Sequence, residues 1–315
     1  MSEPGRHCPL SYRTQATDLA RLPAVCAETA YIIGGLYGNS AALQAILNMA
    51  AAEHPSPVLV FNGDFNWFNA DSTAFRQINR QVLAQHALLG NVEAELVEPQ
   101  PGAGCGCAYP AFVDEAVVTR SNQIMARLQT VAAEHPDIIA ALAALPRQQR
   151  LDIAGLGIGV VHGDPDSLAG WGLGIEAMPP PGVTPPHIAA WFAQADVRVL
   201  ASSHTCVAYA QRFTVSGESC AVFNNGAAGM PNFRHDPRVV ITRISRTPAP
   251  FAPLYACRIG VLYCEAIAVE WAQSEWLLEF ERLWPEGSPA WRSYWERIVN
   301  GPHHGLEQAN RLLYG

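Results

Sequence analysis

Polar side chains that commonly bind metal ions follow four apolar runs of the chain. The runs are "SPVLVFNG", "ALLG", "GLGIGVV" and "VRVLASS", and the residues that follow them are Asp64, Asn91, His162 and His204. Any one of these residues alone is typical of a turn or of a buried structural histidine. Together, one carboxylate, one amide oxygen and two imidazoles form a set of mixed oxygen and nitrogen donors, which suits Mn, Fe or Zn. The ordered set therefore predicts a divalent metal site.

The apolar runs alternate with segments of helical periodicity. Strands are predicted over 30–35 and 56–64, and amphipathic helices over 40–54 and 71–86. A later segment, 238–245, alternates with the period of a strand and suits an edge of the sheet. The alternation of strands and helices predicts an α/β core. Because open α/β sheets bind ligands beyond the carboxyl ends of their strands, we expect the four polar residues to gather there.

The length of 315 residues and the hydrophobic content of 49% predict a single large domain over 1–315. The alternation breaks over 94–150, where a loop rich in Pro, Gly and Cys is followed by segments predicted as helices at 114–135 and 136–151. We interpret 94–150 as a helical insertion or cap. The Trp-rich segment 272–315 predicts a C-terminal helical extension.

Composition excludes several classes of function. The net charge is −8 and no Lys/Arg-rich run is present, which argues against a nucleic-acid-binding surface. No segment approaches the length of a membrane span, and the N-terminus lacks the features of a signal peptide. We therefore expect a cytoplasmic protein that associates with neither nucleic acid nor membrane. Its eight cysteines are expected to be reduced thiols.

The order of the polar turns resembles that of the calcineurin-like metallophosphoesterase superfamily, and within it the small bacterial and archaeal phosphodiesterase branch. The family carries Asp-x-His-Gly-Asn, Gly-Asp, Gly-Asn-His-Glu, His-Gly, Gly-His-x-His and Asn-Pro-Gly-Ser turns. The corresponding segments here are "GLYGN" at 35–39, "GD" at 63–64, "GNVE" at 90–93, "HGD" at 162–164, "SHTC" at 203–206 and "NNGAAG" at 224–229. The resemblance implies an α/β fold of two stacked mixed sheets flanked by helices.

The same resemblance implies a pair of metals bridged by Asp64. The implied ligands of the second metal are all present: Asp64, Asn91, His162 and His204. At the first metal, Gly35 and Tyr37 replace an acid and an imidazole, and Cys206 replaces another imidazole. Val92 replaces a histidine that is not a ligand and that assists protonation at the phosphate. The resemblance therefore implies one divalent metal per chain, because the family's ligands for the other metal are incomplete here.

Two interpretations remain open for the first position. Cys105 and Cys107 follow Asn91 closely in sequence, and with Cys206 they could rebuild the site with thiolates, which favour Zn or iron. The alternative is a tight loop whose thiols only pack. Similarly, the Tyr37 phenol could contact a phosphate or ligate iron, or it could fill the space that the metal left.

We expect the protein to hydrolyse a phosphate ester through a metal-bound water. Asp64, Asn91 and His162 would take part in catalysis, and Asn39 and Arg120 would hold the phosphate. The sequence does not identify the ester.

The leading alternative is a catalytically inactive protein that binds a phosphate ester or a partner. Its Trp-rich tail would then form a homo-oligomer interface through Trp271, Trp276, Trp284, Trp291 and Trp295. A third possibility is redox chemistry at the three thiols named above.

Overall fold

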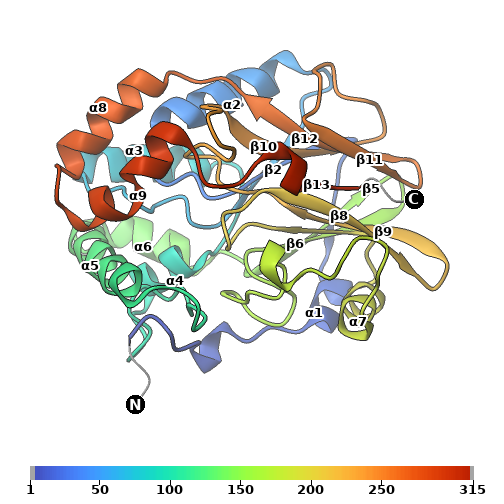
Figure 1. Ribbon diagram of the computed structural model, residues 1–315, viewed down its shortest axis with the longest axis horizontal. Helices are drawn as coiled ribbons and strands as arrows, with labels where there is room; N and C mark the ends of the chain where they lie inside the picture. Colours follow the sequence, from blue (N-terminus) through green and yellow to red (C-terminus); the bar gives the residue numbers. More distant parts are fainter. Residues whose placement is uncertain (1–3, 313–315) are drawn as a thin grey trace.

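Two mixed β-sheets pack face to face, and helices cover their outer faces (Figure 1). This arrangement, seen in a computed structural model that describes residues 4–312, confirms the predicted α/β sandwich. Residues 1–3 and the last three residues of the expected tail, 313–315, lie outside the described part.

Each sheet combines parallel and antiparallel pairs. The seven-stranded sheet contains, in spatial order, β1 (Ala24–Cys26), β5 (Gln148–Ile153), β6 (Leu156–Val161), β7 (Val199–Ser202), β9 (Glu218–Asn224), β8 (Tyr209–Val215) and β13 (Asn310–Arg311). The six-stranded sheet contains β11 (Tyr255–Ile259), β12 (Leu262–Val269), β10 (Val239–Ser245), β2 (Thr29–Ile33), β3 (Val58–Asn62) and β4 (His86–Leu88). In each sheet a parallel trio, β6-β7-β9 or β2-β3-β4, supplies the strand ends that matter below.

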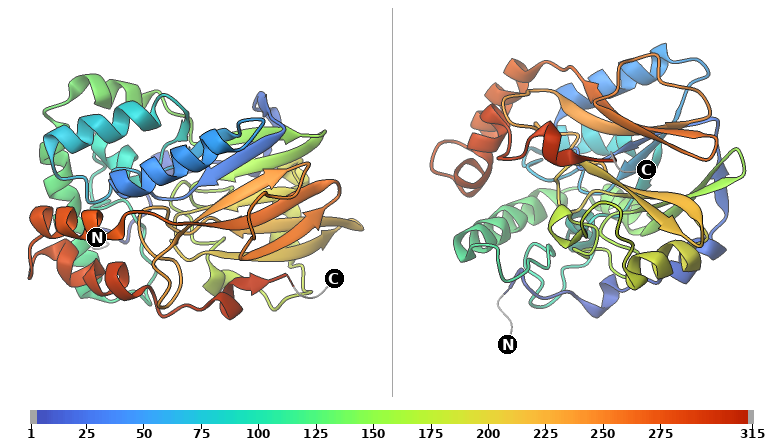
Figure 2. Two further views of the ribbon diagram at one scale, coloured as in Figure 1. Left: turned by 90° about the horizontal axis from the view of Figure 1, so that it is seen from above. Right: turned by 45° about the vertical axis from the view of Figure 1, so that its right-hand side comes forward.

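The helices fall into three groups (Figures 1 and 2). The six-stranded sheet is covered by α2 (Ser40–Ala52), α3 (Ser72–Val82) and α8 (Gln273–Leu283), and the seven-stranded sheet by α1 (Ala16–Arg21) and α7 (Pro186–Ala195). Gathered toward one end of the sandwich are α4 (Asn91–Val97), α5 (Glu115–Ala132), α6 (Pro136–Ala143) and α9 (Pro289–Asn300). Short turns are formed by η1 (Leu10–Tyr12), η2 (Ile175–Ala177) and α10 (Leu306–Ala309). No helix within residues 4–312 has both the length and the apolarity needed to cross a bilayer.

Strand β2 has an apolar run from Ala30 to Ile33, and its two faces explain this run. Side chains alternate between the two faces of a strand. Ala30 and Ile32 point to the core between the sheets, whereas Tyr31 and Ile33 point to the core beneath the helices. All four side chains are completely buried. A strand covered on both faces therefore reads as a continuous apolar run rather than an alternating one.

Three local predictions need correction. The segment 136–151 was expected to be one helix, but α6 ends at Ala143 and β5 begins at Gln148, pairing antiparallel with β6. The segment "ALLGNVEAEL" was expected to form a short strand and a turn, but only its start belongs to a strand, and Asn91–Val97 forms helix α4. Strand β10 lies inside the six-stranded sheet between β12 and β2, not at its edge, and is buried along its whole length.

The tail packs largely against its own chain. Trp276 and Trp284 are buried, and the Trp284 indole donates a hydrogen bond to the Phe68 carbonyl at 2.9 Å. Trp291 and Trp295 are half-buried and stack with ring centroids 6.2 Å apart. Two of the five tail tryptophans are thus core residues, and the homo-oligomer interface stays a prediction.

A buried charge cluster attaches helix α2 to the six-stranded sheet. Arg243 of β10 donates to Glu53 at the end of α2 and to Glu265 of β12, each at 2.6 Å. The Tyr31 hydroxyl also donates to Glu53. Both carboxylates and the guanidinium are almost fully shielded from solvent. The paired charges explain how an arginine can occupy an interior strand.

Replacing Arg243 with Met should lower the free energy of unfolding by about 3–5 kcal/mol, because two buried carboxylates would lose their counter-ion. Chemical denaturation would measure the change. Arg246→Met, at an exposed position directly after the same strand, is the matched control and should change stability little. Equal effects of the two substitutions would contradict a special role for the buried cluster.

Candidate metal centre

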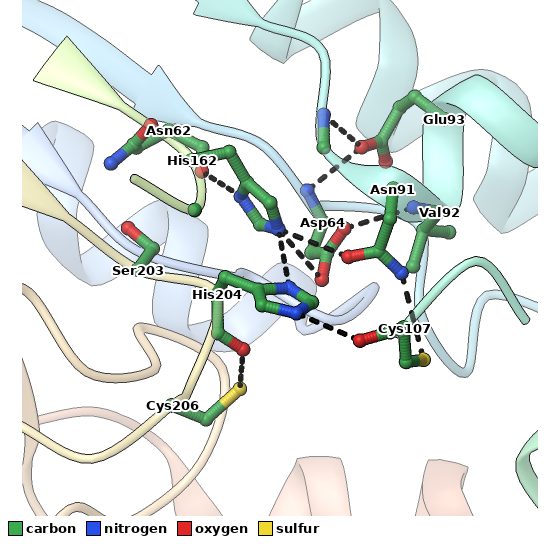
Figure 3. A network of polar contacts seen from close by, with 12 residues as sticks. Asn62, Asp64, Asn91, Val92, Glu93, Cys107, His162, Ser203, His204 and Cys206 are labelled. Carbon is green, nitrogen blue, oxygen red and sulfur yellow. Dashed lines mark hydrogen bonds and ion pairs between the residues drawn. The ribbon is translucent and has the colours of Figure 1, made fainter. Parts of the chain in front are cut away.

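Four potential ligand atoms converge on one point between the two sheets (Figure 3). Nε2 of His162 lies 3.3 Å from Asp64 Oδ2, 3.2 Å from Asn91 Oδ1 and 3.3 Å from His204 Nδ1. All four side chains are buried. The residues that the sequence singled out are therefore brought together.

The strands explain this convergence. Asp64 follows β3, and Asn91 lies just beyond β4 as the first residue of α4. His162 follows β6 directly, and His204 lies just beyond β7. Two ligands thus come from the carboxyl ends of parallel strands in each sheet. The site lies where the two sheets meet.

Hydrogen bonds to backbone carbonyls determine which nitrogen of each imidazole faces the site. His162 Nδ1 lies 2.7 Å from the carbonyl of Asn62, and His204 Nε2 lies 3.0 Å from the carbonyl of Cys107. A carbonyl only accepts hydrogen bonds, so each of these nitrogens carries a proton. In the neutral rings, His162 Nε2 and His204 Nδ1 then present lone pairs to the site, as metal-binding histidines do.

The two oxygen ligands are oriented in the same way. The Asn91 amide donates to the Cys105 carbonyl at 3.1 Å, which turns its Oδ1 toward the site. Asp64 Oδ1 accepts the backbone N–H of Val92 at 3.0 Å, which leaves Oδ2 free. The four inward atoms are therefore all acceptors.

Such a set of acceptors fits a cation. Lone pairs that face one another at 3.2–3.3 Å repel unless a proton or a metal ion lies between them. Two atoms that each lie about 2.1 Å from a metal are about 3.0–3.4 Å apart at octahedral or tetrahedral angles. The observed spacing matches that requirement, and the mixed donors suit Mn, Fe or Zn.

Charge interactions among the side chains point the same way. Burial would lower the pKa of His162, but the charge and hydrogen bond of Asp64, the hydrogen bond to the Asn62 carbonyl and the charge of Glu93 together raise it. Burial, together with the positive charge of His162, lowers the pKa of His204 to about 4. Burial would raise the pKa of Asp64, but the charge and hydrogen bond of His162 hold it below its ordinary value. Without a metal, these interactions therefore favour the protonated form of His162.

Metal affinity should consequently increase with pH. His162 must lose its proton before Nε2 can bind an ion, and its raised pKa keeps the proton competing in the neutral range. Calorimetric titration with Zn²⁺ or Mn²⁺ from about pH 6 to about pH 8 should show tighter binding at the higher pH. Buffers of different ionisation enthalpy should reveal proton release on binding. An affinity that does not change with pH would exclude His162 as a ligand.

Glu93 connects the loops that carry Asp64 and Asn91. Its carboxylate accepts the backbone N–H groups of Asp64 at 2.7 Å, Gly90 at 3.1 Å and Asn66 at 3.1 Å. Burial, and then the charge of Asp64, raises the pKa of Glu93 to about 7. The sequence placed Glu93 inside a motif but assigned it no role.

Comparison with solved structures identifies the architecture. A metallophosphoesterase from Sphaerobacter thermophilus matches 87% of this chain and 100% of its own, with a TM-score of 0.54 and 18% sequence identity. The chain has the metallophosphoesterase fold. A hypothetical protein from Pyrococcus horikoshii OT3 matches 89% of this chain and 100% of its own, with a TM-score of 0.52 and 14% identity. No protein-family model matches the sequence, and a comparison with curated proteins finds no match.

At the position that the family resemblance implies for a first metal, Gly35, Tyr37 and Cys206 pack closely together. The Tyr37 hydroxyl lies 2.5 Å from Cys206 Sγ. A Cβ atom on Gly35 would lie only 2.5 Å from the Tyr37 ring, so the ring occupies the space of any side chain there. Tyr37 and Cys206 both have positive φ, 54° and 59°, which non-glycine residues adopt only at a cost. The geometry favours the interpretation that Tyr37 fills the space.

Gly35→Ala should lower the free energy of unfolding by about 1–3 kcal/mol, because the added methyl group would overlap the Tyr37 ring. In a Tyr37→Ala background the same substitution should cost almost nothing. Urea denaturation of the four proteins in this double-mutant cycle measures the coupling. An equal cost in both backgrounds would show that the ring does not determine the glycine.

The remaining sequence candidates have other contacts. Asn39 caps α2 by accepting the N–H of Ala42 at 2.9 Å and donates to the Gly229 carbonyl at 2.9 Å. Arg120 of α5 donates to Ser293 of α9 at 2.6 Å. Both side chains are thus engaged within the protein, and neither lines the cavity described below.

Within residues 4–312, Cys105, Cys107 and Cys206 do not form a group with metal-binding spacing. Among residues 4–312, the one group of at least three His, Cys, Asp or Glu side chains with metal-binding spacing is Asp64, His162 and His204. Cys105 is completely buried, and Cys206 contacts Tyr37. Cys107 contributes its carbonyl, which accepts hydrogen bonds from His204 and, at 3.0 Å, from Trp171.

A cavity of about 220 Å³ opens beside the four ligands. Its polar lining includes Asp64, Asn91 and His204, and its aromatic lining includes Tyr37, Trp67, Tyr109, Trp171 and Tyr294. Arg297 supplies a positive charge. Sequence reasoning missed Trp67, Tyr109, Trp171, Tyr294 and Arg297. Three of them had a signal in the sequence: Tyr109 lies in the Cys-containing loop, and Tyr294 and Arg297 lie in the Trp-rich tail.

Proposed function

We propose that this protein is a divergent metallophosphoesterase that binds one divalent metal, Mn, Fe or Zn, and hydrolyses a phosphate ester. The observation that carries the proposal is the convergence of four buried acceptor atoms. A hydrogen bond made by another atom of each side chain turns its acceptor atom toward the site. Asp64, Asn91, His162 and His204 would hold the ion. Once bound, a divalent metal polarises a phosphoryl oxygen and acidifies a water molecule.

The residues that line the cavity would contribute to binding and cleavage of the ester. Trp67, Tyr109 and Trp171 offer flat apolar walls against which the organic part of an ester could pack. Val92 lies in the lining and has no group that could protonate a leaving oxygen. Since a missing general acid costs ~10²–10⁴ in rate, esters of acidic alcohols such as phenols should react best.

The alternative is a protein that binds a phosphate ester without cleaving it. The replacement of the first-site ligands by Gly35, Tyr37 and Cys206, and the presence of Val92, favour this alternative. Metal binding and ester binding are common to both functions, so turnover distinguishes them. The cytoplasmic location expected from the sequence stays a prediction.

The wild-type protein should contain about one metal ion per chain, and its hydrolysis of an aryl phosphate should depend on that ion. His162→Ala should lose both, because the other three ligands converge on His162 Nε2. Elemental analysis and turnover of p-nitrophenyl phosphate, with alkyl phosphates for comparison, measure the two quantities.

The matched control is His303→Ala, which changes an exposed histidine in the tail and should affect neither quantity. Cys206→Ala should keep the ion, because the thiol is not part of the ligand group. A second ion that is lost with Cys206 would favour a thiolate site. One ion without turnover of any ester would favour the binding protein, and no ion under any supplementation would refute the proposed metal centre.

A further inference from the structure

Arg297 brings a positive charge from the C-terminal extension into the cavity beside the metal ligands. It lies on α9 and lines the same cavity as Asp64, His204 and Tyr37. Its Nη2 donates to the carbonyl of Cys206 at 2.5 Å. That contact places the guanidinium next to the loop that carries His204.

Neighbouring contacts hold α9 in this position. Ser293, one turn before Arg297, accepts a hydrogen bond from Arg120 of α5 at 2.6 Å. Tyr294 packs edge-to-face on Phe68, with ring centroids 4.8 Å apart. Arg297 is therefore presented by a helix that is anchored on both sides.

The charge of Arg297 is not neutralised within the described chain. Among residues 4–312, no carboxylate forms an ion pair with it. Its Nε is buried and has no hydrogen-bond partner there. Burying part of a positive charge together with an unpaired hydrogen-bond donor costs free energy unless an anion pairs with the charge and accepts the hydrogen bond.

The charge of Arg297 also affects the pKa values of Cys206 and Tyr37, which lie at the position implied for the first metal. Burial raises the pKa of the Cys206 thiol, and the positive charge of Arg297 acts in the opposite direction. The same charge opposes the rise that burial causes in the pKa of Tyr37. Arg297 is thus the positive charge on the side of the cavity where Gly35, Tyr37 and Cys206 provide no metal site.

We propose that Arg297 binds the phosphate group of the ligand within the cavity that Asp64, Asn91 and His204 also line. The proposal rests on the proposed function in one respect, namely that the ligand is a phosphate ester. A guanidinium can donate two parallel hydrogen bonds to phosphate oxygens. Two positive charges, one metal and one arginine, would then hold the group that two metals hold in a two-metal site.

The test measures binding of inorganic phosphate to the metal-loaded protein by calorimetry. Arg297→Gln keeps a donor for the Cys206 carbonyl but removes the charge, and it should weaken phosphate binding roughly 10- to 100-fold. Arg297→Lys keeps the charge and should recover part of the affinity. Arg292→Gln, at an exposed position on the same helix, is the matched control and should bind phosphate as the wild type does.

Metal content and thermal unfolding of every variant separate phosphate binding from a structural role. Phosphate affinity lost in Arg297→Gln with metal content retained supports the proposal. Wild-type phosphate affinity in that variant overturns it, and so does joint loss of metal and phosphate. Absence of turnover in a wild type that binds phosphate through Arg297 would refute the hydrolase alone. Turnover and phosphate affinity that are both unaffected by Arg297→Gln would refute this inference alone.

Discussion

The carboxylate of Glu93 is the contact on which the candidate metal centre depends, because it joins the two loops that follow β3 and β4. By accepting backbone N–H groups from both loops, it determines the path of the chain at Asp64 and Asn91. The loops are so close that a Cβ atom on Gly90 would collide with Asp64. Burying this carboxylate has a cost, which is visible in its raised pKa, and three N–H donors compensate for it. The hydrogen bonds of Glu93 thus determine the geometry of both loops without a metal ion.

A second constraint follows from where the ligands originate. Asp64 and Asn91 belong to the six-stranded sheet, and His162 and His204 belong to the seven-stranded sheet. The site therefore exists only when the sheets pack in the observed register. Residues such as Ile32 and Val160, which fill the core between the sheets, contribute to the site without touching it.

The candidate ligands could be recognised in the sequence because each lies at or shortly after the end of an apolar strand, and strand ends are a local property of the chain. The α/β core could be predicted because strands and helices alternate, and the two-sheet sandwich because the polar turns resemble those of the family in type and order. The cavity wall could not, since Arg297 and Tyr294 reach it from a helix more than 80 residues beyond His204. The segment 136–151 contains enough apolar residues for a helix, and only pairing with β6 makes its second half a strand. The role of Cys107 was also hidden, because its carbonyl acts rather than its thiol, and every residue has a carbonyl.

In the loop "GCGC" at 104–107, the cysteines act through their carbonyls and the glycines permit the backbone conformation. Two of its carbonyls, from Cys105 and Cys107, orient Asn91 and His204. Gly104 and Gly106 have φ values of +59° and +71°, and a methyl group on Gly106 would meet the Tyr12 hydroxyl at 2.5 Å. The glycines therefore shape the loop, and its carbonyls orient the two side chains. Any residue at 105 or 107 would offer the same carbonyl to Asn91 or His204, so the orientation of these two side chains depends on the path of the backbone.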